Sequence, residues 1–306
     1  MAITKIVTDN DGVNINSEDL AMRIMDDEAV KLIGQYRPEL LTELPQDHVY
    51  KTFPGKSTDK IVKALIIGDW DKTDQGNIDR ELPLALIAQD YGLTDNATID
   101  DVSTHIADLI TIATIERFSH ELKSISGVTE SWESLSNTLG ADNLALATTS
   151  RADRMDVSLN HAINPETGEN ARLHTFFPEG TRRFSGYGGA NKYDGFFAQS
   201  GWNPAECAII EDSDSGVNYA KANRPDTKVI GTVAADFFTD KQAQASKLLS
   251  KGADIVISTM HDLPKAVQWL NDGMDPEKQP DFQGTIYTPI PHDLTSAPAP
   301  SAPTMK

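Results

Sequence analysis

Two aspartates separated by one residue, Asp9 and Asp11, stand near the start of the chain, directly after the apolar segment Ile3–Thr8. One carboxylate can attack phosphorus and form an aspartyl-phosphate. A second carboxylate close by can protonate the leaving oxygen and later deprotonate water. An Asp-x-Asp-Gly sequence alone is usually a turn. Here it is joined by the later acidic pair Glu211 and Asp212, which adds oxygen ligands of the kind that Mg²⁺ binds.

A hydroxyl and an ammonium group complete this set. Thr148, Thr149 and Ser150 follow the apolar run Leu144–Ala147, and Lys192 follows a glycine-rich stretch. These groups can hold phosphoryl oxygens and balance the charge that develops on them. Thr148 is the expected phosphate ligand, and Thr149 or Ser150 would replace it if the strand ended one residue later. The set as a whole predicts phosphoryl transfer through an aspartate.

The chemistry-bearing residues lie at the ends of predicted strands. Between these strands lie helical stretches such as 215–223 and 241–251, and this alternation predicts an α/β domain with a mainly parallel sheet. Ligands bind such sheets at the carboxyl ends of the strands. We therefore expect the acidic groups to meet at one edge. The predicted strands are 3–8, 144–148, 208–211, 228–231 and 254–257.

The stretch 18–124 contains helix signals and little strand signal. Ser17 is the expected N-cap of its first helix, and Thr98 opens a capping-box variant for a helix that runs to about Leu122. The sequence thus predicts an α/β core made of 1–17 and 125–277 and a helical insertion at 18–124. Residues 164–191 are expected to form a long loop or flap, and 278–306 a disordered or loosely docked Pro/Ala-rich tail.

Composition limits the classes of function. The chain of 306 residues carries 46 acids and 27 bases, a net charge of −19, which repels nucleic acid and anionic membranes. Neither is an expected partner, and a phosphate site here needs a local cation. No apolar run approaches the roughly 20 residues that span a bilayer. The start does not read as a signal peptide, and the single Cys207 excludes an internal disulfide, so we expect a cytoplasmic protein.

Two of these segments resemble motifs of a known family. The opening 9–13 is similar to the first motif of the haloacid dehalogenase (HAD) superfamily, and 209–217 is similar to its fourth. The form is that of the phosphoglycolate phosphatase and β-phosphoglucomutase branch, which inserts a helical cap after the first motif. The resemblance covers about 1–270, weakly in the cap and in 160–190. It implies a Rossmann-like core and a Mg²⁺ cofactor.

The resemblance also implies roles for the matching residues. Asp9 would be the nucleophile and a metal ligand. Asp11 would be the acid/base, with its backbone carbonyl also on the metal. Thr148 would bind the phosphoryl group, and Asp212 would ligate Mg²⁺, with Glu211 as a ligand or as the partner of one.

Two basic residues are implied with less support from the motifs. Lys192 would neutralise the phosphoryl group, but Lys192-Tyr193-Asp194-Gly195 departs from the family's Lys-Pro-x-Pro-Asp. Arg182 and Arg183 therefore remain rivals for this role. Residues 53–57 resemble the family's substrate loop, from which Lys56 would contact the substrate.

Three functions compete at this point. The first is a Mg²⁺-dependent phosphatase acting on a small phosphorylated metabolite through an aspartyl-phosphate. The second is a phosphomutase of the β-phosphoglucomutase type, in which the phosphoryl group returns to the substrate. The third is a non-catalytic phosphate-binding protein on the same scaffold. The sequence identifies neither the substrate nor the oligomeric state.

Overall fold

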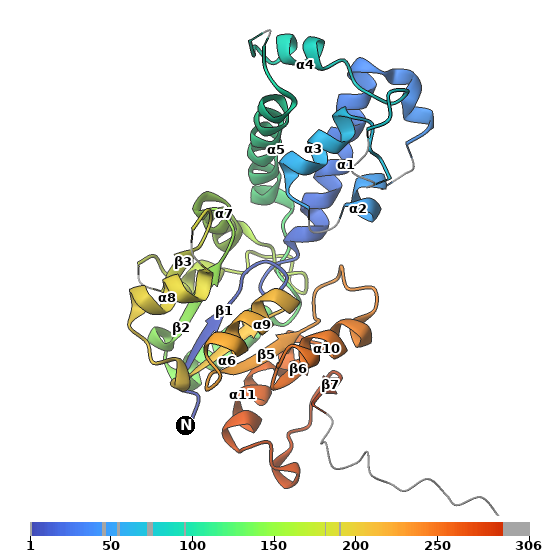
Figure 1. Ribbon diagram of the computed structural model, residues 1–306. Coiled ribbons are helices and arrows are strands. Elements are labelled where there is room, and N and C mark those ends of the chain that lie inside the picture. The colour runs from blue at the N-terminus through green and yellow to red at the C-terminus, as the bar shows by residue number, and fades with distance from the viewer. Residues whose placement is uncertain are drawn as a thin grey trace, which may run out of the picture.

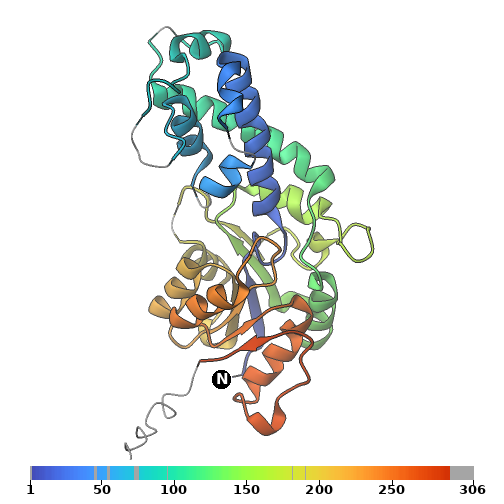
Figure 2. The same cartoon turned by 90° about the vertical axis from the view of Figure 1, so that its right-hand side faces the viewer.

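The computed structural model describes residues 2–44, 47–53, 56–71, 76–94, 96–180, 182–189 and 191–289, without the side chain of Tyr50. The chain forms two bodies, which Figures 1 and 2 show in two views. One is a sheet with helices on both faces. The other is a helical body, which the chain forms between the first and the second strand of the sheet.

The sheet has seven strands in the order β3-β2-β1-β4-β5-β6-β7. The strands from β1 to β6 are parallel, and β7 pairs with β6 in the antiparallel sense. Every residue of β2 and β4 is buried, which explains why these segments read as continuous apolar runs. This topology confirms the predicted α/β core. The strands are β1 Lys5–Thr8, β2 Leu144–Thr148, β3 Arg183–Ser185, β4 Cys207–Glu211, β5 Lys228–Thr232, β6 Ile255–Ile257 and β7 Ile286–Tyr287.

Alternate residues of each strand pack on opposite faces of the sheet. Ile6 and Leu146 belong to one apolar core, with side chains of α6, α7 and α11. Val7 and Ala147 belong to the other, with side chains of α8, α9 and α10. The sheet is therefore covered on both faces. These helices are α6 Val128–Leu139, α7 Ala152–His161, α8 Lys192–Ser200, α9 Asp214–Asn223, α10 Lys241–Ser250 and α11 Leu263–Asn271.

The helical body has an apolar core of its own, in which Phe53, Trp70 and Ile106 are buried. The predicted capping box is confirmed, because Thr98 and Asp101 bond reciprocally at the start of the longest helix. None of the described helices is long and apolar enough to cross a bilayer. The body consists of α1 Ser17–Tyr36, α2 His48–Thr52, α3 Thr58–Ile66, α4 Leu84–Asp90 and α5 Ile99–Glu121.

Two segments are more ordered than the sequence predicts. The expected loop 164–191 contributes strand β3 to one edge of the sheet. The expected tail contributes β7 to the other edge, because the buried carboxylate of Asp262 accepts the backbone N–H groups of Gln283 and Gly284 at 2.8 and 2.7 Å. The prediction that the tail begins at 278 is therefore wrong for residues 286 and 287, while 290–306 lie outside the described residues.

Candidate active site

The predicted site residues meet at the carboxyl ends of three neighbouring strands. Asp9 follows β1, Thr148 ends β2, and Glu211 ends β4, with Asp212 next in the chain. The sheet order places β1 between β2 and β4. A cavity of about 430 Å³ opens at this edge and is lined by Asp9, Asp11, Glu18, Thr149, Asn191, Lys192, Asp212, Ser213, Ser215, Gly216 and Tyr219.

Asp9 is buried beside a buried cation. The Nζ of Lys192 lies 2.6 Å from Asp9 Oδ2, and the backbone N–H of Asn10 donates to Asp9 Oδ1 at 2.8 Å. Burial raises the pKa of Asp9 to about 7, although Lys192 lowers it. A carboxylate in this state is weakly hydrated, so further positive charge would hold it ionised.

Lys192, at the start of α8, bridges Asp9 and Glu211. Its Nζ lies 3.0 Å from Glu211 Oε2, and its side chain is 6% exposed. Burial alone would lower the pKa of Lys192, but the two carboxylates raise it above its ordinary value, so the ammonium stays charged. The rivals lie elsewhere: Arg183 pairs with Asp156 at 2.9 Å, and Arg182 approaches Asp142 at 3.5 Å. The geometry favours Lys192 over both arginines.

Glu211 is enclosed by partners. The hydroxyl of the buried Tyr193 donates to Glu211 Oε2, and the hydroxyl of Ser213 donates to Oε1. A Cβ on Gly216 would lie 2.2 Å from the Glu211 carboxyl carbon, so only glycine leaves room for this carboxylate. Tyr193 follows the lysine at the point where the family pattern is lost. At this position Tyr193 supplies a hydrogen bond that fixes the carboxylate of Glu211.

The carboxyl oxygens of Asp9, Glu211 and Asp212 lie within 4.8 Å of one another. Burial and the two neighbouring carboxylates raise the pKa of Asp212 well above its ordinary value. Gly12 permits this arrangement, because its φ is +74° and a Cβ there would lie 1.9 Å from Asp212 Oδ2. Three hard oxygen donors in one small volume fit a divalent cation such as Mg²⁺.

Asp11 lies in the same cavity but faces different partners. Its carboxylate accepts from Ser150 Oγ at 2.6 Å and Arg154 Nη2 at 2.9 Å, and also from the Ser17 hydroxyl. Burial raises the pKa of Asp11, but Arg154 and the two hydroxyls bring it below its ordinary value. The carboxylate of Asp11 is thus apart from the metal-binding set, and the role predicted for its backbone carbonyl stays a prediction.

Sequence reasoning missed Arg154 and misplaced Ser17. Arg154 lies in the first turn of α7, and its guanidinium also covers the ring of Phe118 from α5, 5.0 Å from the centroid. The one available signal was its place in the helix that follows β2, whose first turn faces the site. Ser17 was predicted to be an N-cap, which is wrong. Asn16 occupies that position without a side-chain cap, while the Ser17 hydroxyl donates to Asp11 instead.

Thr148 and Thr149, the predicted phosphate ligands, differ in their surroundings. Thr148 ends β2 as predicted, but it is buried, and its hydroxyl accepts the backbone N–H of Ser150 at 3.1 Å. Thr149 lines the cavity. The Thr148 hydroxyl is thus engaged in the turn after β2, and phosphate binding by either threonine stays a prediction.

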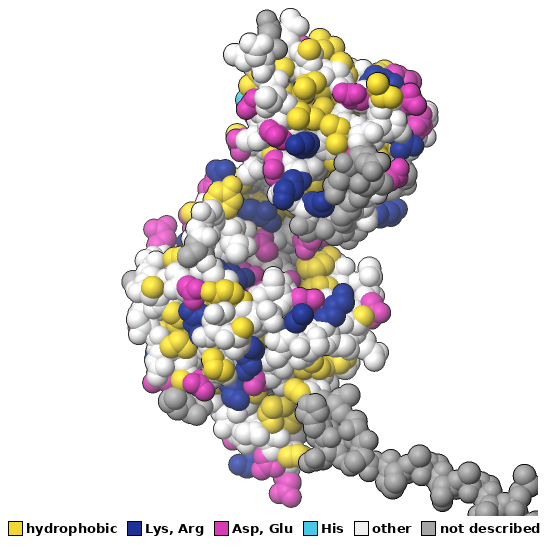
Figure 3. All heavy atoms as spheres, viewed as in Figure 1, with side chains coloured by type: hydrophobic (Ala, Val, Ile, Leu, Met, Phe, Trp, Pro, Cys, Tyr) yellow, Lys and Arg dark blue, Asp and Glu magenta, His cyan; other side chains and the backbone are white. Residues whose placement is uncertain are grey.

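Lys56 faces the core from the helical body. It lines a cavity of about 460 Å³ together with Thr149, Ser150, Arg151 and Tyr187 of the core. In Figure 3, Lys and Arg side chains gather around the hollow between the two bodies. The position of Lys56 agrees with a substrate contact, which stays a prediction. The neighbouring residues 54 and 55 of the predicted substrate loop lie outside the described residues.

Comparisons with known proteins identify the fold. No family model and no curated protein matches the sequence. Solved structures do match, at low sequence identity. A predicted phosphoglycolate phosphatase from Haemophilus somnus is 15% identical with a TM-score of 0.55, covering 87% of this chain and 98% of its own. A protein assigned as a β-phosphoglucomutase from Thermotoga maritima is 16% identical with a TM-score of 0.53, covering 88% and 99%.

A third match is a HAD family hydrolase from Deinococcus radiodurans, solved with bound phosphate and sodium. It is 18% identical with a TM-score of 0.51, covering 88% of this chain and 96% of its own. Together these likenesses show that the chain has a HAD-like fold, which confirms the predicted resemblance at the level of fold. At such identities they carry no substrate across.

Proposed function

We propose that this protein is a Mg²⁺-dependent phosphomonoesterase that hydrolyses a small phosphorylated metabolite through an aspartyl-phosphate at Asp9. The observation that carries the proposal is the contact of Asp9 with Lys192 at 2.6 Å, beside the carboxylates of Glu211 and Asp212. Such a cluster of buried carboxylates is costly unless a cation offsets it. In phosphoryl transfer such carboxylates would serve as the nucleophile and as metal ligands.

In the proposed first step, an oxygen of Asp9 attacks phosphorus and the bond from phosphorus to the ester oxygen breaks. Lys192 stabilises the negative charge of the phosphoryl oxygens, and Thr149 offers a hydroxyl at the cavity wall. A bound Mg²⁺ would add positive charge for the phosphoryl group. The departing oxygen takes a proton from Asp11.

In the second step, water attacks the aspartyl-phosphate, Asp11 takes a proton from that water, and inorganic phosphate leaves Asp9 regenerated. Arg154 and Ser150 hold Asp11 ionised in the present arrangement, which suits this second step. For the first step Asp11 must carry a proton. We therefore infer that substrate entry separates Arg154 from Asp11.

The helical body acts as a cap in this proposal. Lys56 faces the core across a cavity that also contains Arg151 and Tyr187, so a substrate bound at Asp9 would extend between the two bodies. A closed site of this kind excludes water and restricts access to small molecules. The lining of this cavity includes Lys56, Arg151 and Arg154 beside Asp59 and Asp108. Its basic side chains support phosphomutase activity as a second candidate, because they could hold a second phosphate while the first is transferred.

The test is hydrolysis of p-nitrophenyl phosphate and a panel of phosphorylated metabolites, with and without Mg²⁺. We expect Mg²⁺-dependent phosphate release and a loss of about a thousandfold or more in kcat for Asp9→Asn. Asp142→Asn is the matched control, because the Asp142 side chain is 97% exposed and remote from the site. Activity that survives in Asp9→Asn contradicts the mechanism, and isomerised sugar phosphate without free phosphate favours the mutase.

A further inference from the structure

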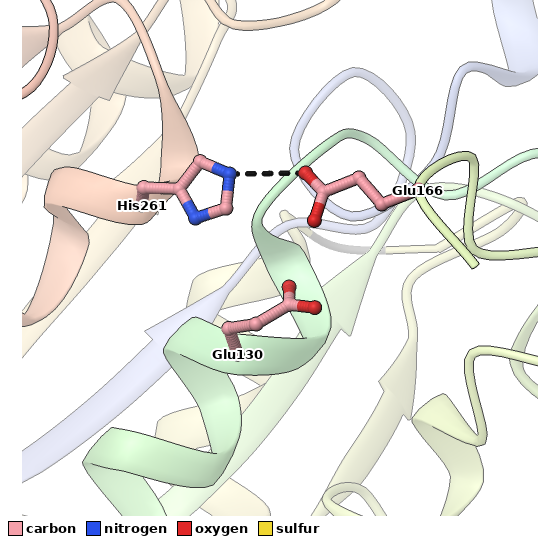
Figure 4. A group of neighbouring side chains, drawn as sticks. All are labelled: Glu130, Glu166 and His261. Atoms are coloured by element: carbon pink, nitrogen blue, oxygen red, sulfur yellow. Dashed lines mark hydrogen bonds and ion pairs between the residues drawn. The ribbon is translucent and has the colours of Figure 1, made fainter.

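A second group of metal-ligating side chains lies outside the proposed active site (Figure 4). It comprises Glu130 in the first turn of α6, Glu166 in the loop after α7, and His261 in the short 3-10 helix after β6. Their ligand atoms all lie within 4.8 Å of one another. The three residues are far apart in sequence, so the fold and not a local turn brings them together.

Each of the three side chains has a contact with a neighbouring residue. His261 Nε2 lies 3.0 Å from Glu166 Oε1, and the hydroxyl of Ser126 donates to the same oxygen. The ring of His261 packs on Gly127, where a Cβ would lie 2.7 Å from the ring. Asn164 Nδ2 reaches Glu130 Oε1 at 3.5 Å. A supporting partner for a ligand is common in protein metal sites, because it fixes the orientation of the ligand.

The negative charge of the two glutamates is not balanced by neighbouring basic residues among those described. Two carboxylates adjoin one imidazole, and among the ion pairs of the described residues His261 is the sole partner of Glu166, while Glu130 has none. A divalent ion would offset both carboxylates and use the imidazole as a neutral ligand.

We propose that Glu130, Glu166 and His261 form a binding site for a transition-metal ion of the Zn²⁺ class. One imidazole nitrogen and two carboxylates are a known ligand set for Zn²⁺, whereas Mg²⁺ prefers oxygen ligands alone. Bonds of roughly 2.0–2.2 Å require the donors to draw together from their present separation. Both glutamates are exposed, so their side chains can rotate to do so.

The site would join three segments beneath the helical body. Ser126 and Gly127 belong to the segment through which the chain returns from α5 to the core. The loop that carries Glu166 already pairs with this segment, because Ile163 N–H donates to Leu122 O at 2.8 Å and Ser124 N–H donates to Ile163 O at 2.9 Å. A bound ion would fasten the loop and the 3-10 helix of His261 to each other across this segment.

The experiment measures Zn²⁺ binding to the chelator-treated full chain by calorimetry, with excess Mg²⁺ present to fill the carboxylate site. We expect one equivalent of Zn²⁺, weakened about tenfold or more by His261→Ala and by Glu130→Gln, and about tenfold by Ser126→Ala. His120→Ala is the matched control, since His120 is exposed in the last turn of α5. Circular dichroism verifies that each variant is folded.

Two results would overturn the proposal. One is Zn²⁺ affinity and stoichiometry that do not change in folded His261→Ala and Glu130→Gln. The other is an equivalent of Zn²⁺ that Asp9→Asn removes and His261→Ala retains, since that ion would occupy the active site. Co²⁺ in place of Zn²⁺ adds an independent readout, because loss of the imidazole ligand in His261→Ala alters its visible absorption.

Discussion

Replacing Asp9 by Asn should stabilise the metal-free protein while it removes the nucleophile. Burial raises the pKa of Asp9 from an ordinary 3.8 to about 7. The folded state therefore binds the proton more tightly than the unfolded state does, and the free energy of unfolding falls as the pH rises from about 4 to about 7. Asn has the same shape and no charge, so the variant avoids this loss.

The size of the effect follows from the shift in pKa. Each unit is worth about 1.4 kcal/mol, so Asp9→Asn should exceed the wild type by about 4 kcal/mol above pH 7. The gap should widen by about 3 kcal/mol between pH 5 and pH 8, since the shift predicts continued titration up to about pH 7. Urea unfolding in the presence of a chelator, followed by circular dichroism at the two pH values, measures it.

Mg²⁺ should narrow this gap. An ion at one hundred times its Kd adds about 2.7 kcal/mol to the wild type, and less to a variant that lacks one ligand. Asp142→Asn should show neither effect, because that side chain is almost fully exposed. A gap between Asp9→Asn and the wild type that is absent at pH 8, or equal at both pH values, would refute the argument that burial destabilises the charged carboxylate.

Three further variants test the neighbours of the acidic cluster. Gly12→Ala should weaken Mg²⁺ binding, because the new Cβ would lie 1.9 Å from Asp212 Oδ2. Gly92→Ala controls for backbone strain, since Gly92 has a similar φ of +69° and nothing within 4 Å of the position that a Cβ would take. Equal Mg²⁺ affinity in the two variants would contradict this reasoning. Tyr193→Phe should cost about 2 kcal/mol of stability in urea unfolding, because Glu211 loses a buried donor, while Tyr187→Phe at an exposed position should cost little. Arg154→Met removes the cation that lowers the pKa of Asp11, so the protonated acid should persist to higher pH and the alkaline limb of kcat/KM should move to higher pH. An unchanged limb would show that Arg154 does not act on the acid/base.

The positions of the acidic residues could be predicted because they depend on a general rule. Continuous apolar runs identify buried parallel strands, and the carboxyl ends of such strands meet at one edge of the sheet. Asp9, Thr148 and Glu211 each stand at such an end. Lys192 could be proposed from its type and place, although its local sequence departs from the family pattern. The structure brings it to both Asp9 and Glu211.

The remaining contacts depend on tertiary structure that leaves no local pattern. Arg154 and Tyr193 reach Asp11 and Glu211 across the fold, and nothing in their neighbouring residues marks them. Ser17 has the sequence context of a helix cap, but its hydroxyl donates to the carboxylate of Asp11 instead. A hydrogen bond to a charged acceptor is stronger than one between a hydroxyl and a neutral backbone N–H group. Strands β3 and β7 could not be predicted, because they are short, half-buried edge strands without an apolar run.

The helical body leaves and rejoins the core at adjacent points. Ile15 and Ser124 form an antiparallel bridge, and the N–H of Asn16 donates to Lys123 O at 3.0 Å. A short turn could join these two points without altering the register between β1 and β2. The root of the insertion is nevertheless part of the reactive edge, because Ser17 of α1 donates to Asp11 and Phe118 of α5 packs against Arg154. Changes farther out in the helical body can therefore alter what the cavity admits without disturbing the acidic residues, whereas changes at its root cannot.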